Sequence, residues 1–119
     1  MVKISWEVET VTCSDMTVTA CHTPFDNGVL IYITDSDVKI SSIAIATPVP
    51  KIVSKSGTSS TPLVFGAKNS LITKAIAEKV ARSTEKISIV MMHLQDQESK
   101  DIMNLVMKLI DNILQKKQK

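Results

Sequence analysis

The sequence of 119 residues is poor in the residue types that mark several functional classes. Aromatic residues make up 3%, too few for the stacking platforms that bind single-stranded nucleic acid. Lys and Arg number 14 against 12 Asp and Glu, so the net charge of +2 gives no phosphate-binding footprint. Gly occurs three times, and the chain has no GxGxxG or P-loop motif. We therefore expect no nucleic-acid partner and no cofactor.

Membrane and secretory signals are also missing. No apolar run approaches the roughly 18 residues of a membrane span. Residues 1–10 alternate in polarity and carry two Glu, unlike the continuous apolar core of a signal peptide. Cys13 and Cys21 lie far apart in one extended-looking segment, which predicts free thiols. We expect a protein of the cytoplasm, or of cytoplasm and nucleus, without a membrane partner.

What is present is an ordinary globular composition, with 44% hydrophobic and 22% charged residues. The length predicts one domain over residues 1–119. Residues 3–9 and 16–20 alternate between polar and apolar side chains, which predicts strands. Asp-Asn-Gly at 26–28 predicts a turn. The unbroken apolar run at 29–33 is typical of a strand buried on both faces.

The middle of the chain predicts two more strands around a long loop. Within residues 38–45 the apolar side chains shift from even positions (38 and 40) to odd positions (43 and 45), which predicts a strand with a bulge at 41–42. Residues 48–60 hold two Pro, one Gly and five Ser or Thr, which favours an irregular loop. A short strand is predicted at 61–65, and Pro62 restricts it to a sheet edge or must itself stand at the first position of the strand.

The second half changes to helical periodicity. Apolar residues at three and four spacing predict helices over 71–80, with Asn69 or Ser70 as N-cap, and over 102–113, capped by Asp96. Between them, residues 87–94 predict a strand apolar in both phases. The fold class is therefore α+β: a mostly antiparallel sheet of about six strands with two helices packed on one face.

This pattern leaves the second face of the sheet to be explained. Two helices cover one face, whereas the strands at 29–33 and 87–94 are apolar on both. An open apolar face is a binding site or an aggregation hazard, so the face is predicted to be available for dimerisation or for another partner. In the alternative, the strands curl and the long loop folds over that face.

Catalytic and metal sites find no support in the spacing of reactive residues. Cys21 and His22 are adjacent, so on a strand they point to opposite faces and cannot easily share a metal. No CxxC or HxxxH spacing accompanies Cys13 or His93. We predict no metal site and no catalytic residues. A small hydrolase that uses Cys13 or Cys21 is the alternative.

Residues 75–86, the strand at 87–94 and Gln95 resemble the proteasome assembly chaperone 4 family. That family has a helix ending Leu-Ala-Arg-Lys-Thr-x-Lys, a hydrophobic strand ending Asn-Leu-Gln, and a terminal amphipathic helix. The first half of the chain matches the family only in pattern, and His93 stands where the family has Asn. The sister family, proteasome assembly chaperone 3, shares the fold. The matching residues are Ala81, Arg82, Thr84, Lys86, Leu94 and Gln95, with Ser60, Thr61, Leu63 and Gly66 upstream.

The resemblance implies a protein that is not an enzyme and needs no cofactor. Such chaperones form a heterodimer with a chaperone 3 homologue, bind a 20S proteasome α subunit, chiefly α5, and promote assembly of the α-ring. In isolation the chain is then a candidate homodimer. A roadblock- or profilin-like dimerisation module of a trafficking or motor complex is the alternative, although roadblock domains usually place a helix early.

The partner-binding residues follow from these expectations. We place the pairing surface on one face of the sheet, with Leu30 and Tyr32 from the first buried strand and Val90 and Met92 from the last. The contact with the α subunit is predicted in the long loop, at Lys51 and Lys55, because of the loop's length and polarity.

Overall fold

The computed structural model describes residues 4–13, 15–48, 59–66, 68–95 and 100–117. Strands fill the first half of the chain, and both helices belong to the second half. In chain order the elements are β1 (Glu7–Cys13), β2 (Met16–Phe25), β3 (Gly28–Thr34), β4 (Ser42–Pro48), β5 (Ser59–Phe65), α1 (Ser70–Thr84), β6 (Ile87–His93) and α2 (Lys100–Lys117).

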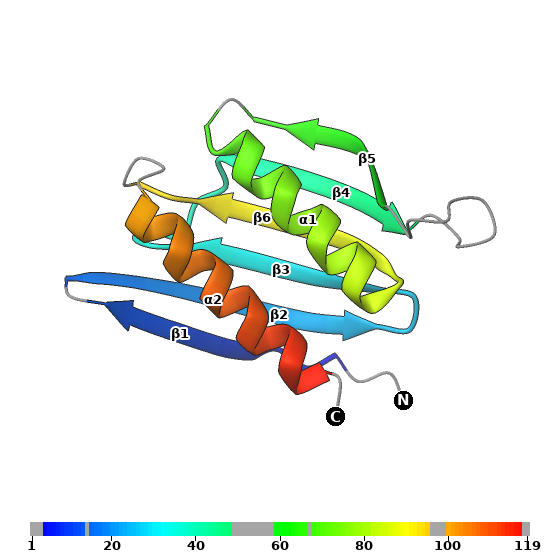
Figure 1. The fold of residues 1–119 in the computed structure, drawn as a ribbon, viewed down its shortest axis with the longest axis horizontal. Coiled ribbons are helices and arrows are strands. Elements are labelled where there is room, and N and C mark those ends of the chain that lie inside the picture. The colour runs from blue at the N-terminus through cyan, green and yellow to red at the C-terminus, as the bar shows by residue number, and fades with distance from the viewer. Residues whose placement is uncertain (1–3, 14, 49–58, 67, 96–99, 118–119) are drawn as a thin grey trace.

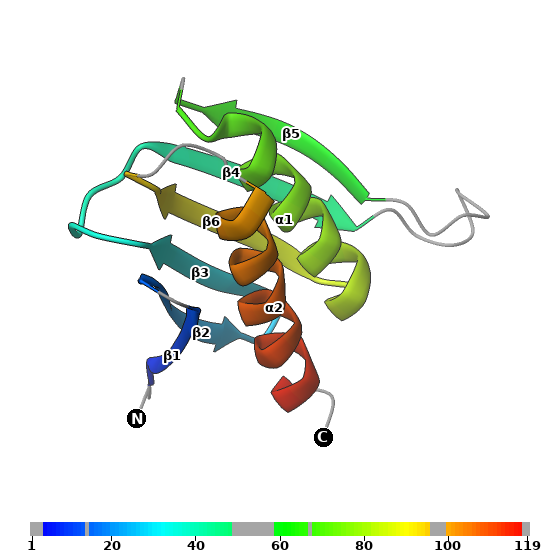
Figure 2. The ribbon, with the colours of Figure 1, turned by 60° about the vertical axis from the view of Figure 1, so that its left-hand side comes forward.

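The six strands form one open sheet in the order β1-β2-β3-β6-β4-β5. The central pair, β3 and β6, is parallel, and every other pair is antiparallel. Both helices lie on the same side of this sheet, α1 over β4, β5 and β6 and α2 over β1 and β2 (Figures 1 and 2). The predicted fold class, a mostly antiparallel α+β sheet with two helices on one face, is confirmed.

Local sequence explains how the central strands come together. Phe25 pairs with Gly28, so residues 26–27 make the tight turn that Asp-Asn-Gly predicts. A parallel neighbour needs a long crossover connection, and here β4, β5 and α1 supply it before β6 returns beside β3. The two most apolar strands therefore lie at the centre of the sheet.

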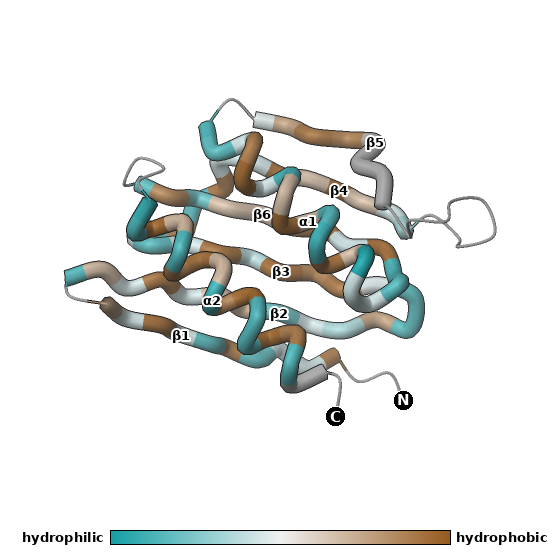
Figure 3. Tube along the Cα trace, viewed as in Figure 1, coloured by the Kyte–Doolittle hydropathy of each residue, from teal (hydrophilic) through white to brown (hydrophobic). Residues whose placement is uncertain are grey.

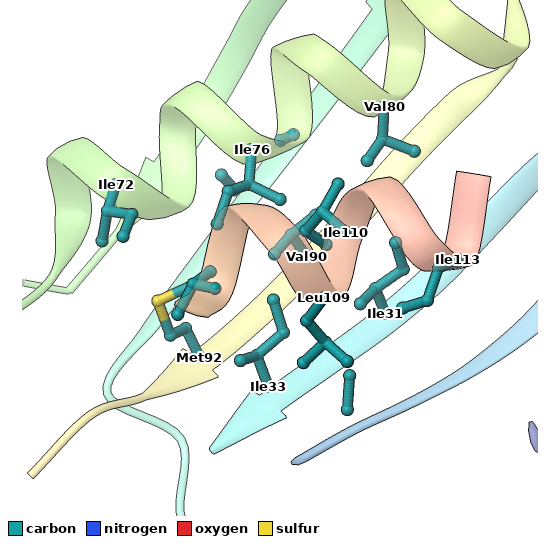
Figure 4. Packing of buried hydrophobic residues seen from close by; sticks show 14 of the residues in the cluster. Ile31, Ile33, Ile72, Ile76, Val80, Val90, Met92, Leu109, Ile110 and Ile113 are labelled. Atoms are coloured by element: carbon teal, nitrogen blue, oxygen red, sulfur yellow. The ribbon is translucent and has the colours of Figure 1, made fainter. Parts of the chain in front are cut away.

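The core fills the space between the sheet and the helices. Ile31 and Ile33 of β3 and Val90 and Met92 of β6 point toward α1 and α2 and are fully buried (Figure 4). Burial of each such side chain stabilises the fold by about 1.5–3 kcal/mol. Figure 3 shows hydrophobic residues along β3, whereas hydrophilic and hydrophobic residues alternate on the helices. From the helices, the fully buried residues include Ile76, Val80, Leu109, Ile110 and Ile113.

The fourth strand differs from its prediction. β4 begins at Ser42, and residues 35–41 form a loop in which Val38 and Ile40 are exposed. The predicted bulge at 41–42 is wrong, because the change of apolar phase marks the loop-to-strand boundary. The irregularity of β4 lies instead between Ile45 and Thr47, where its register with β5 shifts. Of the two placements that Pro62 allows, the structure has the edge position, since β5 is the last strand of the sheet.

Helix α1 is joined to the sheet by its N-cap residue. Asn69 takes the N-cap position, as predicted, but its side chain makes no capping hydrogen bond. Its Oδ1 instead accepts a hydrogen bond from the backbone N–H of Leu94, at 3.2 Å, which ties the helix start to the end of β6. Farther along, Lys79 Nζ lies 2.8 Å from Asp111 Oδ1 and links the two helices. Asp96 lies outside the described residues.

Neither of the two described helices combines the length and apolar character needed to cross a bilayer. The loop predicted over 48–60 is described only at its ends, where Pro48 closes β4 and residues 59–60 open β5.

Gly66 provides a test of how closely β5 and β4 approach. Its φ of 99° is in the left-handed region, and a Cβ there would overlap the carbonyl oxygen of Ser41 and lie 2.8 Å from Ser42 Cα. We expect Gly66→Ala to lower the free energy of unfolding by about 2 kcal/mol or more, measured by urea denaturation. Gly28→Ala is the graded comparison, since its Cβ would lie 2.9 Å from Ile87 O without a positive φ. Equal stability of Gly66→Ala and the parent chain would contradict this packing.

Candidate interaction surface

The face of the sheet turned away from the helices is defined by strand register. Tyr32 pairs with Cys21 on one side and with Met91 on the other, and Met91 pairs with Ile43. Paired residues point to the same face, so one row of side chains crosses the sheet. We call this side the open face. Its strand residues are Val8, Thr10, Thr12, Thr17, Thr19, Cys21, Thr23, Phe25, Gly28, Leu30, Tyr32, Thr34, Ile43, Ile45, Thr47, Leu63, Phe65, Ile87, Ile89, Met91 and His93.

The open face carries no Asp, Glu, Lys or Arg at any of these strand positions. Charged side chains are mostly exposed in proteins, so a solvated sheet face ordinarily carries several of them. The outer side of the helix layer follows that rule, with exposed Lys74, Arg82 and Lys108. Depletion of charge is instead the mark of the central part of a protein–protein interface.

The open face is apolar over four strands and rich in threonine over the other two. Across β3, β6, β4 and β5, Leu30, Ile89, Ile45 and Leu63 form one row, and Leu63 remains 47% exposed. On β1 and β2, threonine hydroxyls pair across the strands, Thr10 with Thr19 at 3.3 Å and Thr12 with Thr17 at 3.2 Å. The apolar part is thus central and extends to the β5 edge, with a polar margin at the β1 edge.

The size of the face suits a stable interface. Six strands at about 4.8 Å spacing and about seven residues long cover roughly 29 by 23 Å, on the order of 660 Å² before side-chain relief is counted. Standard interfaces bury about 800 Å² per partner. One domain docked on this sheet would therefore bury an area of the usual magnitude.

Two of the four residues predicted for the pairing surface lie on the open face, and two do not. Leu30 and Tyr32 are half-buried open-face residues. Val90 and Met92 are fully buried beneath the helices, so their placement beside Leu30 and Tyr32 is wrong. The β3–β6 register pairs Leu30 with Ile89 and Tyr32 with Met91, and these two β6 residues occupy the open face instead. Lys51 and Lys55 lie outside the described residues.

The sizes of the side chains in β4 indicate which face of the sheet the helices cover. In β4, Ala44 and Ala46 face the helices and are fully buried, whereas the larger Ile43 and Ile45 point to the open face. The facing helix α1 also contributes small buried residues, Ala77 and Ala81 among them. Small side chains on both elements let α1 approach β4 closely, so small residues mark the helix-covered face here.

The reactive side chains are distributed over both faces. Cys21 lies half-buried on the open face, and the adjacent His22 is fully buried on the helix face, with Nε2 3.6 Å from Glu7 Oε2. Cys13 is exposed on the edge strand β1, where its position in the strand places it on the helix-covered face of the sheet. His93 lies on the open face, with Nδ1 2.6 Å from Ser41 Oγ. Within the described ranges, no three His, Cys, Asp or Glu side chains are grouped so that they could hold a metal ion.

No family model matches this chain, and no curated protein sequence is significantly similar to it. The fold is similar to that of a chain in the crystal structure of a chaperone complex for yeast 20S proteasome assembly. The TM-score is 0.57 at 12% sequence identity, over 95% of this chain and 91% of that chain. At that identity the similarity concerns the fold.

The open face leads to a prediction about the purified chain. We expect it to self-associate as its concentration rises through the micromolar range, because pairing removes apolar surface from water. Ile45→Glu places a charge at the centre of the open face and should shift the sedimentation profile to monomer. Leu71→Glu is the matched control, since Leu71 is 77% exposed on α1. A parent chain that stays monomeric at every concentration would contradict the prediction.

Proposed function

We propose that this protein is a non-catalytic assembly chaperone of the 20S proteasome that acts as a pair with a second chaperone of similar fold. The observation that carries the proposal is the charge-free open face, on a domain whose fold is similar to that of a chain in a yeast 20S assembly complex. The proposed location is the cytoplasm, or the cytoplasm and nucleus.

The pairing itself is proposed to be sheet against sheet. Two apolar sheet faces pack about 10 Å apart, with interdigitated side chains between them. Leu30, Tyr32, Ile45, Ile89 and Met91 are then the central contact residues on this side. Every one of them is at least partly accessible in the single chain, so the interface can form without refolding of the domain.

The proposed pairing partner is a homologue of proteasome assembly chaperone 3. The supporting residues are those that resemble chaperone 4, and the fold gives several of them structural roles. Ala81 and Leu94 are fully buried, and the N–H of Leu94 bonds to Asn69. Arg82 lies exposed in the last turn of α1. The resemblance thus concerns the scaffold that holds the open face, more than the face itself.

The chaperone pair is proposed to bind one 20S α subunit, chiefly α5, and to favour its correct neighbours in the α-ring. No bond is made or broken in this mechanism. Selection of one subunit over its homologues is a difference between binding free energies, and unfavourable contacts with the wrong subunit contribute as much as favourable ones. Lys51 and Lys55 are the proposed contacts with the α subunit.

The alternative, a roadblock- or profilin-like dimerisation module, would also use a sheet-based domain of this size. For a roadblock domain we expect an early helix. In the part of the chain that the structure describes, five strands precede α1. The element order therefore favours the assembly chaperone.

The two cysteines allow a test of sheet pairing without any mutation. When the chain binds a chaperone 3 homologue, alkylation of Cys21 on the open face should slow at least tenfold, because the partner covers it. Cys13 is the internal control, because it is exposed at the β1 edge and lies on the opposite face of the sheet from Cys21. It should react at its original rate. The rates are measured by mass spectrometry after timed quenching. A complex in which Cys21 reacts as fast as in the free chain would refute pairing through this face.

Binding to the α subunit is tested separately. The purified pair should bind α5 more tightly than the other α subunits, as measured by calorimetry. Charge reversal by Lys51→Glu and Lys55→Glu together should weaken that binding about tenfold or more, because opposite charges across an interface contribute to specificity. Lys108→Glu, on the exposed side of α2, is the control. Unchanged affinity of the double variant would remove the 48–60 segment from the contact.

A further inference from the structure

The loop between β3 and β4, residues 35–41, presents two aliphatic side chains to solvent. Val38 is 86% exposed and Ile40 is 59% exposed. Single exposed aliphatic residues are ordinary on protein surfaces, and loops are usually polar. Here, by contrast, two β-branched residues lie at alternate positions of one short loop and together form an exposed aliphatic pair. We call this segment the rim loop.

The rim loop is held in place by hydrogen bonds within the loop and from the end of β3. Thr34 Oγ1 donates to the carbonyl oxygen of Asp37 at 2.7 Å, and Lys39 N donates to the same oxygen at 3.1 Å. The hydroxyl of Tyr32 donates to the carbonyl oxygen of Lys39 at 2.5 Å. The side chains of Lys39 and Asp37 lie 3.7 Å apart as an exposed ion pair. Val38 and Ile40 are therefore presented by a fixed backbone.

The rim loop is attached to the open face. Tyr32, which holds it at one point, is an open-face residue, and so is His93, whose Nδ1 lies 2.6 Å from Ser41 Oγ at the end of the loop. The backbone of Ser41 also donates to the carbonyl oxygen of Met92 at 2.9 Å. Figure 2 shows the β3–β4 connection projecting beyond the strands on the side away from the helices. The loop thus forms a raised margin at one end of the open face.

We propose that the rim loop contacts the end of the partner's sheet and fixes the register in which the two domains pair. Val38 and Ile40 would insert into an apolar depression of the partner. This inference rests on the proposed function, since it assumes that a second domain of similar fold covers the open face.

The physical need for such a contact follows from the open face itself. Hydrophobic attraction has no direction, and a face without charged residues supplies few contacts that distinguish one sliding position from another. A raised, rigid margin at the end of the face supplies a contact that is made in only one of these positions. Because the loop is already ordered, little conformational entropy is lost when it binds. Lys39, which lies between the two aliphatic residues, is paired with Asp37, so the aliphatic side chains are the contacts on which the inference rests.

The test measures affinity for a purified chaperone 3 homologue with rim-loop variants. We expect Val38→Ser and Ile40→Ser each to raise the dissociation constant about tenfold, and the double variant about 100-fold, chiefly through faster dissociation. Leu71→Ser is the matched control, an exposed aliphatic residue on the helix layer, and should leave affinity unchanged. Urea midpoints of all variants should equal that of the parent chain, because the altered side chains are exposed in the free domain.

The outcomes separate this inference from the proposed function. If Ile45→Glu abolishes pairing while the rim-loop variants pair normally, the inference is overturned and sheet pairing stands. If none of these variants affects pairing, both are overturned. If the rim-loop variants pair normally but lose binding to the α subunit, the loop belongs to another interface and the inference is overturned. Weaker pairing of the rim-loop variants, with unchanged stability and an unaffected Leu71→Ser control, supports it.

Discussion

The organisation of this protein depends on the packing of one layer of helices against a sheet whose central strands are apolar on both sides. The buried residues of β3 and β6 meet α1 and α2 and form the centre of the hydrophobic core. The opposite side chains of the same strands, Leu30, Tyr32, Ile89 and Met91, are left accessible on the open face. The same two strands therefore supply both the buried core of the domain and the accessible apolar residues of the open face.

This arrangement also explains how the open face is organised. The small residues Ala44 and Ala46 are directed toward α1, where close approach is possible, and the larger Ile43 and Ile45 are directed outward. The helix-facing side of β4 thus carries small side chains that allow close packing, and the outer side carries larger ones. Bulk without charge is suited to contact with another apolar surface, which is the physical basis of the proposed pairing.

The rim loop and the threonine margin bound the apolar part of the face in different ways. The hydroxyls of Thr10 and Thr19 hydrogen-bond to each other on the face, so this margin is polar yet uncharged. At the end of β3 and β6, hydrogen bonds from Tyr32 and Thr34 hold Val38 and Ile40 above the sheet. The first margin is compatible with water at the edge of an interface, and the second with insertion into a partner.

The amino-acid sequence by itself determined the class of fold, the turn at 26–28 and the surplus of apolar strand surface, and through Pro62 it reduced the placement of β5 to two possibilities. Each of these follows from local periodicity or from the special backbone of Gly, Asn and Pro.

Only the tertiary structure decided which side of β6 is covered. Strand residues 87–93 are apolar in both phases, so hydrophobicity favours neither, and the choice depends on register with β3 and on the volumes that fit beneath the helices. That is why Val90 and Met92 are core residues while Ile89 and Met91 lie on the open face. It is also why the change of phase near residue 41 is the boundary of a loop rather than a bulge, since hydrogen bonds to Tyr32 in the preceding strand and to His93, distant in sequence, shape that loop.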